Sequence, residues 1–329
     1  MAVKRILSGM QPTGTLHLGN LEGALKNWVQ LQYQYEMFCC IVDWHALTTM
    51  YDRTDQITTQ AVEVAADYIA AGLDPDRCAI FIQSHVKEHA ELHLLFSMIT
   101  PLGWLERVPT YKEKRENLGL NDESLSYGLL GYPVLQAADI LVYRAHAVPV
   151  GKDQIPHIEL TREIARRFNR LYGEVFPEPE QMVNEVAAVV PGMDGRKMSK
   201  SYGNAIYLSD DPDAVRAKVN EAFTCPTKIR KSDPGVPENC VVCQLRRTFD
   251  PDGYLPSWEE DRAGTRGCVQ NKRELTDVIN ARLAPIRARR AELLADPGQI
   301  LRYLESGADR ARAAAEETMK AVRHAMGLG

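Results

Sequence analysis

The chain has 329 residues, of which 45% are hydrophobic and 25% are charged, and its formal net charge is −5. This length allows two domains with sizeable cores. No run of about 18 apolar residues occurs, which excludes a membrane-spanning helix. The opening segment MAVKRILSGM leads into polar residues too soon for the roughly 7–15 apolar residues of a signal peptide, so we expect a cytoplasmic protein with no membrane partner.

Net charge and cysteine content limit how the protein can bind a nucleic acid and whether it is held by disulfides. An acidic chain meets a nucleic acid only through local basic patches, because its overall field repels phosphate. The seven cysteines are odd in number, and the chain is neither short nor of secreted character. A disulfide framework is therefore not expected.

The first part of the chain alternates short apolar runs with helical patterns. Runs typical of buried strands occur at residues 5–10, 37–43, 78–83, 147–151 and 185–192. Helical spacing predicts helices from about residue 18, at 54–71, after residue 83, at 132–143 and at 153–168. Pro133 suits the first turn of its helix. This alternation predicts an α/β fold, a Rossmann-like parallel sheet with crossover helices, in which ligands bind beyond the carboxyl ends of the strands.

The character of the chain changes after about residue 204. A short helix is expected at 211–222, and a loop-rich stretch with cysteines follows at 225–268. Residues 271–325 are rich in Ala, Arg, Leu and Glu and predict two or three helices. We therefore expect one domain over 1–203 and a mostly α-helical domain over 204–329, whose last helix could pack back on the first domain.

The segment TGTLHLGN (13–20) joins the first strand to the first helix. The free N–H groups and the positive dipole end of a helix favour phosphate oxygens. His17 adds a donor, and Gly19 lets a flat ring approach the backbone closely. The G-x-G-x-x-G of a dinucleotide site is absent. Taken alone, the segment fits an ordinary capped helix with an incidental histidine at least as well as a nucleotide site.

The segment KMSKS (197–201) is cationic in an acidic chain. It lacks the G-x-x-x-x-G-K of a P-loop and is not a fixed phosphate cradle. Lys197 and Lys200, in a flexible loop, could close over a leaving polyphosphate and neutralise the charge that develops there. The alternative is a solvated charged loop, the usual fate of such runs.

Together, HLGN and KMSKS resemble the two signatures of the class I aminoacyl-tRNA synthetases. SGMQPTG (8–14), YPVLQAAD (132–139) and VPVGKDQIPHIELTREIA (148–165) further resemble the bacterial tryptophanyl-tRNA synthetase family. The resemblance runs from residue 4 to the closing AMGLG and is weakest at about 225–270. It implies activation of L-tryptophan with ATP, transfer to tRNA(Trp), a homodimer, a catalytic domain over 1–203 and an anticodon-binding domain over 204–329.

The resemblance also implies an ATP site. The residues that would border ATP are Gln11, Pro12, Thr13, Gly19, Asn20, Gly151, Lys152, Asp153, Val189, Met198, Ser199 and Ser201. His17 would face the phosphates, and Lys114 would reach them. Lys197 and Lys200 would stabilise the departing pyrophosphate. Mg²⁺ would share that task, since it commonly bridges nucleotide phosphates.

Asp139 is the candidate for amino-acid choice. It lies among apolar residues of its helix, so its carboxylate is expected to be buried, which is costly without a partner. One reading is an internal helix-packing hydrogen bond. In the family this position accepts the indole N–H, the polar handle of tryptophan. Tyr132 and Gln154 would hold the amino-acid end. Leu7 and Gln136 would wall the indole pocket, where many bacterial members have Phe and Met.

Two patterns suggest metals. HVKEH (85–89), with His93 beyond it, matches a zinc-protease pattern, although adventitious surface binding or none is the preferred reading. Four cysteines have the spacing C-x14-C-x2-C-x24-C: Cys225, Cys240, Cys243 and Cys268. Thiolates in this number suit zinc or an iron–sulfur cluster. Buried or free thiols are the alternative.

Some tryptophanyl-tRNA synthetases carry a [4Fe–4S] cluster on C-x22-C-x6-C-x2-C. The flanks KSDPGVPENC and GCVQNK resemble that motif, so Cys240 and Cys268 match two ligands. The two other positions hold Asp261 and Asn271, which are not thiols. The family pattern is therefore broken, and Cys225 and Cys243 would have to serve from new positions.

The basic stretches KIRK (228–231) and RARR (287–290) are candidate contacts to tRNA, with solvated faces as the alternative. Three rival functions stay open. A tyrosyl-tRNA synthetase is a structural relative, and VGKDQ and QPTG argue against it. A small-molecule adenylyltransferase would not need the helical C-terminal domain. A degenerate paralogue that binds RNA or senses redox state would not need an intact Lys197, Lys200 and Asp139.

Overall fold

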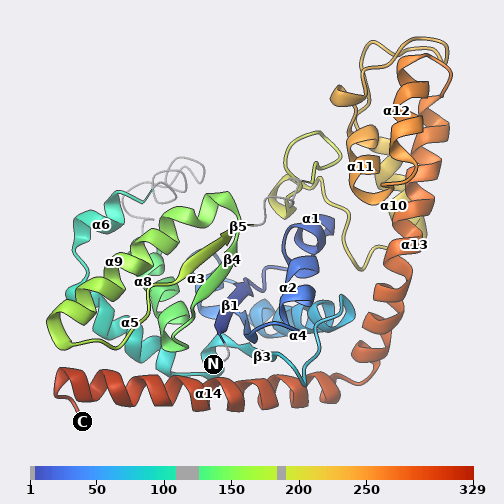
Figure 1. Ribbon diagram of the computed structural model, residues 1–329. Coiled ribbons are helices and arrows are strands. Elements are labelled where there is room, and N and C mark those ends of the chain that lie inside the picture. The colour runs from blue at the N-terminus through green and yellow to red at the C-terminus, as the bar shows by residue number, and fades with distance from the viewer. Residues whose placement is uncertain (1–3, 109–125, 184–189) are drawn as a thin grey trace.

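The sheet at the centre of the molecule is parallel throughout. The computed structural model describes residues 4–108, 126–183 and 190–329 (Figure 1). Within them the 5-stranded sheet has the order β3-β2-β1-β4-β5. Its strands are β1 (Arg5–Met10), β2 (Glu36–Ile41), β3 (Ala79–Ile82), β4 (Ala147–Val150) and β5 (Glu180–Val183). This arrangement agrees with the α/β, Rossmann-like sheet that the alternation predicts.

Both faces of the sheet are buried, which explains why its strands are continuous apolar runs. Successive side chains of a strand point to opposite faces. Cys39 of β2 packs in one apolar cluster, whereas its neighbours Phe38 and Cys40 pack in another. Helices cover each face.

The helices on one face are α1 (Leu18–Asn20), α2 (Lys26–Leu31) and α4 (Asp55–Ala70). A π-helical turn, Leu21–Leu25, joins α1 to α2. The helices on the other face are α5 (Glu88–Ile99), α8 (Tyr127–Val142) and α9 (Ile155–Tyr172). The short helices α3 (Asp43–Met50) and α6 (Leu102–Glu106) complete this half. Among the described residues, no helix is both long and apolar enough to cross a bilayer.

The strand order fixes where a ligand binds. The chain runs outward from β1 to β2 and β3 on one side and to β4 and β5 on the other. The crossovers therefore diverge between β1 and β4, and a crevice opens beyond the carboxyl ends of these strands. The residues after Met10 and after Val150 lie at that crevice.

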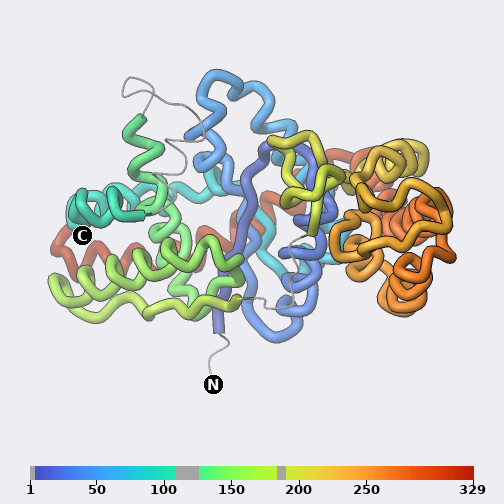
Figure 2. The backbone as a smooth tube through the Cα atoms, turned by 90° about the horizontal axis from the view of Figure 1, so that it is seen from above, coloured from blue at the N-terminus to red at the C-terminus, as the bar shows by residue number. Residues whose placement is uncertain are grey.

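The rest of the chain is helical. Its helices are α10 (Pro212–Glu221), α11 (Val241–Phe249), α12 (Tyr254–Arg262), α13 (Cys268–Ala295) and α14 (Pro297–Met326). The helices α10 to α12 and the start of α13 form an arm beside the sheet domain (Figures 1 and 2). The 28-residue α13 leads from this arm back to the body. The 30-residue α14 then runs beneath the sheet.

The approach of α14 to the sheet depends on a glycine. A Cβ at Gly307 would lie 2.0 Å from the carbonyl oxygen of Ile80 in β3. Only glycine lets the helix backbone lie this close to the strand. The last helix is thereby packed against an edge of the sheet.

Two local expectations are wrong, and a third lies mostly outside the described residues. Pro133 lies inside α8, because that helix starts earlier, at a Ser126 cap that accepts from the Leu129 N–H at 3.1 Å. The fifth strand of the sheet lies at Glu180–Val183; of the strand expected at 185–192, residues 185–189 lie outside the described residues, and residues 190–192 carry only an isolated bridge from Pro191 to Lys197. The stretch 225–268 holds α11 and α12 and is less loop-like than expected.

Candidate active site at the carboxyl ends of the strands

A cavity of about 530 Å³ opens at the carboxyl ends of β1 and β4. The residues predicted to bind tryptophan all line it: Leu7, Tyr132, Gln136, Asp139 and Gln154. It is also lined by part of the predicted ATP set: Gln11, Asn20, Gly151 and Asp153. Residues far apart in the chain thus meet where the sheet topology expects a ligand.

The carboxylate of Asp139 lines this cavity and accepts three side-chain hydrogen bonds. Its Oδ2 accepts from Nε2 of His45 at 2.7 Å. Its Oδ1 accepts from Nε2 of Gln83 at 2.7 Å and from Nδ1 of His89 at 2.6 Å. Burial favours the neutral form, but the hydrogen bonds and charges of His45 and His89 outweigh it and lower the pKa of Asp139 to about 2. Asp139 is therefore an ionised, fixed acceptor.

A second layer fixes the first. Nε2 of the fully buried His89 lies 2.6 Å from the hydroxyl of Tyr143. Burial raises the pKa of Tyr143 well above its usual range, so the phenol keeps its proton. The Tyr143 hydroxyl and Nε2 of His89 are hydrogen-bonded to each other, and the Nδ1–H of His89 donates to Asp139. The two bonds together fix the orientation of the His89 ring.

The lining of the cavity suits an aromatic ligand with a hydrogen-bond donor. A carboxylate has about four acceptor positions, and the three protein donors leave acceptor capacity on Oδ2, beside His45. Asp139 and His45 both face the cavity, and Trp28 lines it as well. The rings of His45 and Tyr132 lie edge to face with centroids 6.3 Å apart. The site can thus hold an aromatic ring that carries one N–H donor.

The open side of the cavity is polar. The Tyr132 hydroxyl lies 3.2 Å from Nε2 of His157. Nε2 of Gln154 donates to Oδ2 of Asp153 at 2.9 Å, within the turn that follows β4. Lys152 starts this turn and is exposed. These groups offer both donors and acceptors near the mouth of the cavity.

The HLGN turn, residues 17–20, caps the first helix through reciprocal bonds. The Asn20 N–H donates to Nδ1 of His17 at 3.3 Å, and the His17 N–H donates to Oδ1 of Asn20 at 3.0 Å. A Cβ at Gly19 would lie 2.9 Å from the His17 ring, so glycine leaves room for it. Burial, reinforced by the charges of Lys200 and Lys197, lowers the pKa of His17 to about 4. The ring is neutral at pH 7, and its Nε2–H is left as a donor.

The HLGN turn and the KMSKS loop, residues 197–201, lie side by side (Figure 2). The segment after the loop pairs with the turn: the Leu18 N–H donates to the Ile206 carbonyl at 2.9 Å, and the Leu208 N–H to the Leu16 carbonyl at 2.8 Å. Met198 is buried, and a Cβ added at Gly19 would lie 3.6 Å from the Met198 Cβ. Two segments that are far apart in the sequence therefore form one surface.

The two lysines of the KMSKS loop differ in their surroundings. Lys200 is half-buried, and its Nζ donates to the Gly14 carbonyl at 2.5 Å. Burial lowers the pKa of Lys200 to about 8, and the charge of Asp67 opposes that shift. Lys197 is exposed. Ser199 caps the short turn Lys200–Tyr202 by accepting from the Ser201 N–H at 3.3 Å.

Known proteins with this sequence pattern and fold share a family. The family described as tRNA synthetases class I (W and Y) matches residues 2–284. The chain is 45% identical to the tryptophan–tRNA ligase of Aquifex aeolicus, over 98% of this chain and 100% of the relative. It is 49% identical to that of Thermotoga maritima, over 98% and 99%. The chain belongs to the tryptophanyl-tRNA synthetases of class I.

A solved member of this family has the same fold. The tryptophanyl-tRNA synthetase of Campylobacter jejuni, complexed with ADP and tryptophan, is 38% identical, and the match covers 98% of this chain and 100% of that one with a TM-score of 0.89. Several residues that the family suggests for ATP lie outside the cavity, around the HLGN turn and the KMSKS loop: Pro12, Thr13, His17, Gly19, Lys197, Met198, Ser199, Lys200 and Ser201. Lys114 and Val189 lie outside the described residues.

Sequence analysis missed the partners of Asp139 in this synthetase. His45, Gln83 and His89 come from α3, the end of β3 and α5. Only His89 stood out, and as part of a metal pattern. The signal available was the polar residue at the end of each strand, since such residues converge at the carboxyl edge of a parallel sheet. The pattern HVKEH marks a hydrogen-bond donor, not a zinc ligand set.

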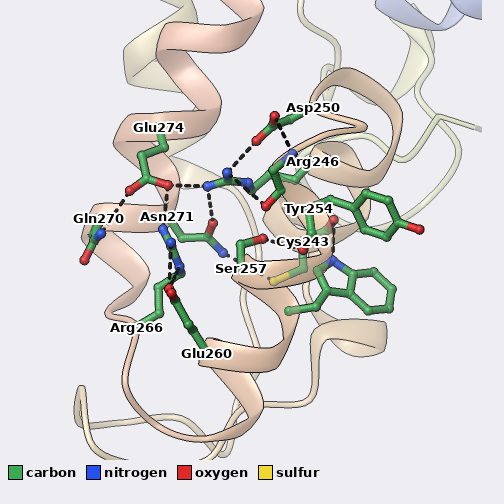
Figure 3. A network of polar contacts seen from close by, with 12 residues as sticks. Cys243, Arg246, Asp250, Tyr254, Ser257, Glu260, Arg266, Gln270, Asn271 and Glu274 are labelled. Carbon is green, nitrogen blue, oxygen red and sulfur yellow. Dashed lines mark hydrogen bonds and ion pairs between the residues drawn. The ribbon is translucent and has the colours of Figure 1, made fainter.

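The four cysteines do not form the predicted metal site. Among residues 4–108, 126–183 and 190–329, no group of three or more His, Cys, Asp or Glu side chains is placed to hold a metal ion. Asn271 instead donates to the sulfur of Cys243 at 3.4 Å (Figure 3). Nζ of the buried Lys228 lies 3.3 Å from Asp261. A buried ion pair and an amide thus occupy the two positions at which the family's cluster motif is broken.

Hydrogen bonding also explains the lowered pKa of one thiol in this region. The hydrogen bond from Cys243, with backbone N–H groups, lowers the pKa of Cys240 to about 7. Figure 3 shows Asn271 joining Cys243 to a larger network, in which Arg246 binds Glu274 at 2.5 Å and Asn271 at 3.0 Å. Side-chain hydrogen bonds and ion pairs therefore hold α11 to α13 where a metal was expected.

The RARR stretch of α13 is mostly directed at the protein. Nη1 of Arg287 donates to the Asp210 carbonyl at 3.0 Å. Nε of Arg290 donates to Asp67 at 2.7 Å. Arg289 faces outward, 2.9 Å from Glu292. The guanidinium groups of Arg287 and Arg290 are thus engaged within the body, and the contact of this stretch with tRNA stays a prediction.

Proposed function

We propose that the chain is a tryptophan–tRNA ligase, which activates L-tryptophan with ATP and then transfers it to tRNA(Trp). The observation that carries this proposal is the juxtaposition of three parts. A buried, ionised acceptor lies in an aromatic cavity at the switch point of the sheet, and the HLGN turn and the KMSKS loop meet beside it. The tryptophan–tRNA ligases that resemble the chain over almost its full length support the same substrate.

Tryptophan would enter with its indole N–H on Oδ2 of Asp139. That atom already accepts one hydrogen bond, from His45, and faces the cavity. Phenylalanine has no N–H, so it would leave a buried carboxylate under-satisfied, and sites of this kind reject such analogues strongly. Leu7 and Gln136 would flank the ring, while Tyr132 and Gln154 at the polar mouth would hold the ammonium and carboxylate ends.

ATP would lie across the ends of β1 and β4, between tryptophan and the two signature segments. Gln11, Pro12, Thr13, Gly19 and Asn20 would border it from the first turn. Gly151, Lys152 and Asp153 would contact it from the turn after β4. His17, neutral with its Nε2–H free to donate, suits a phosphate oxygen. Mg²⁺ would arrive bound to the phosphates, since it commonly bridges nucleotide phosphates.

The activation step joins two substrates. A carboxylate oxygen of tryptophan attacks the α-phosphorus of ATP, the bond to the β-phosphate breaks, and pyrophosphate leaves with the electron pair. Negative charge therefore grows on the leaving group, beside Lys197 and Lys200. Fixed cations at such a place stabilise the transition state most. In the second step a ribose hydroxyl of tRNA attacks the acyl carbon, and AMP leaves.

The helical part, residues 204–329, would bind the anticodon region of tRNA, and residues 1–203 would form the catalytic domain. The arm carries a pocket of about 480 Å³, formed by residues 228–231, 267–270 and Arg273, which we call the tip pocket. Exposed cations on it are Arg230, Lys231 and Arg273. Exposed aliphatic side chains lie beside them, on Ile229 and Val269. Cations with apolar platforms suit phosphates and unstacked bases.

A homodimer in the cytoplasm is the assembly we propose. Large apolar side chains are exposed on α5, α6 and α8: Leu94, Met98, Leu102 and Tyr127. Burial against a second copy is a common reason for such exposure. Light scattering of the purified chain tests this. A monomer that persists at high concentration contradicts it.

The test of function is amino-acid-dependent exchange of pyrophosphate into ATP, measured with each of the twenty amino acids. Exchange with tryptophan alone is the expected result. Exchange with tyrosine and not tryptophan would establish the tyrosyl alternative. Absence of exchange with all twenty, in a folded protein that still binds RNA, would establish the degenerate paralogue.

A further inference from the structure

A buried ion pair lies directly beneath the HLGN turn. Asp67, on α4, is fully buried. Its Oδ2 accepts from the Leu16 backbone N–H at 3.0 Å. Its Oδ1 accepts from Nε of Arg290 on α13 at 2.7 Å, and Nη2 of Arg290 also lies 3.2 Å from Glu63. One carboxylate therefore joins α13 to the residue that precedes His17.

The bond to Leu16 completes the support of the turn. The Leu16 carbonyl accepts from the Leu208 N–H at 2.8 Å, beyond the KMSKS loop. Without Asp67, the Leu16 N–H would be a buried donor with no acceptor, and buried donors require a partner. With both backbone groups held, the peptide that leads into His17 has a fixed orientation. The orientation of His17 Nε2–H follows from it.

The charge of Asp67 also acts on a residue of the KMSKS loop. Its charge raises the pKa of Lys200 against the effect of burial. Lys200 binds the Gly14 carbonyl, two residues before Leu16. The Asp67 carboxylate therefore holds the turn by a direct hydrogen bond and acts on Lys200 through its charge.

We propose that Asp67, held by Arg290, is a positioning residue for ATP: it fixes the HLGN turn in the orientation that receives the phosphates. This rests on the proposed function. Neither side chain lines the cavity, so neither touches tryptophan. The alternative is that the pair only fastens α13 to the body, and it predicts a loss of stability with no selective effect on ATP.

The test compares variants that separate the acceptor from the charge. Asp67→Ala removes the acceptor of the Leu16 N–H. The double variant Asp67→Asn/Arg290→Gln keeps an acceptor there and leaves no unpaired buried charge. Arg323→Gln is the matched control. Arg323 lies 2.6 Å from Glu91, so this substitution also removes an ion pair, here between α14 and α5 and away from both signature segments.

We expect Asp67→Ala to lower kcat/KM for ATP by roughly ten- to hundredfold, as a misplaced contact does, with KM for tryptophan unchanged. The double variant should recover most of this loss, and Arg323→Gln should leave both KM values unchanged. Kinetics are measured well below each variant's melting temperature. If Asp67→Ala does not fold, Arg290→Gln alone decides by the same split between the two substrates.

A second readout does not require activity. Hydrogen exchange of peptides that cover residues 14–18 should be faster in Asp67→Ala and unchanged in Arg323→Gln. The positioning role would be overturned if hydrogen exchange of residues 14–18 in Asp67→Ala were as slow as in the wild type. It would also be overturned if Asp67→Ala lost kcat/KM equally for ATP and for tryptophan. A wild-type protein without tryptophan-dependent activity would instead overturn the proposed function, and the hydrogen-exchange result would still report on Asp67 and Leu16.

Discussion

The polar side chains around Asp139, in the cavity at the ends of β1 and β4, are buried and hydrogen-bonded. In the tip pocket most polar side chains are exposed. In the cavity, the Asp139 carboxylate is held by three buried donors, one of which is itself held by Tyr143. In the tip pocket, Arg230 and Lys231 are exposed beside Ile229, which is 88% exposed. A cavity of the first kind is preorganised for one rigid ligand. A surface of the second kind suits a flexible polyanion that supplies its own order.

This difference predicts where substitutions act. Changes in the cavity or at the signature segments should alter chemistry and substrate choice. Changes at the tip pocket should alter only the use of tRNA.

The largest effect is expected from the double variant Lys197→Ala/Lys200→Ala. One preorganised donor at a developing charge contributes about 3–4 kcal/mol to activation, so loss of both lysines should nearly abolish tryptophan-dependent exchange, with KM for tryptophan little changed. The measurement is steady-state exchange kinetics. Arg196→Ala is the control, because Arg196 directly precedes the loop, pairs with Asp194 and stacks 4.1 Å from the centre of the Tyr202 ring. Exchange that survives the double variant contradicts the role of the loop.

The next effect concerns the indole N–H. A tryptophan analogue with sulfur in place of the indole nitrogen should lose about 2–3 kcal/mol of kcat/KM, the value of a hydrogen bond to a charged group. In His89→Leu this preference should shrink, because Asp139 loses a donor and its fixed position. In His89→Asn, whose amide can replace the Nδ1–H, the preference should be largely kept. Equal discrimination in all three proteins would show that Asp139 does not read the indole.

These residues also mark the limit of sequence analysis. Asp139 was predictable, since a lone carboxylate in an apolar helix must have a purpose. Its donors were not, because they come from three separate elements and only the folded sheet brings them together. The periodicity that predicts strands and helices carries no information on such contacts.

In the arm, sequence patterns suggest functions for residues that instead have structural contacts. KIRK is typical of a basic surface stretch, but Lys228 is buried against Asp261 and only its neighbours face solvent. The cysteine pattern suggests a metal, yet hydrogen bonds and ion pairs join the same helices. Local composition predicts the charge of the arm, whereas packing decides which charges remain available to a partner.

A pH effect is expected from Lys200. Its pKa of about 8 means that the free enzyme loses this charge as the pH rises above that value. We therefore expect kcat/KM for ATP to fall by up to about tenfold per pH unit, or about 1.4 kcal/mol, on the alkaline side. Lys200→Arg should remove this fall, because arginine stays charged. A falling limb that persists in Lys200→Arg assigns the titration to another group.

The smallest effects should follow from Arg230→Ala, Lys231→Ala and Arg273→Ala. Each should raise KM for tRNA(Trp) severalfold and reduce the slope of log K against log salt by roughly 0.7–0.9, as loss of one phosphate contact does. Exchange without tRNA should stay at the wild-type rate. Arg289→Ala is the matched control, since Arg289 lies on α13, is exposed and already pairs with Glu292. If all four variants behave alike, the tip pocket contributes no more than general charge, and the contrast with the preorganised cavity loses its functional meaning.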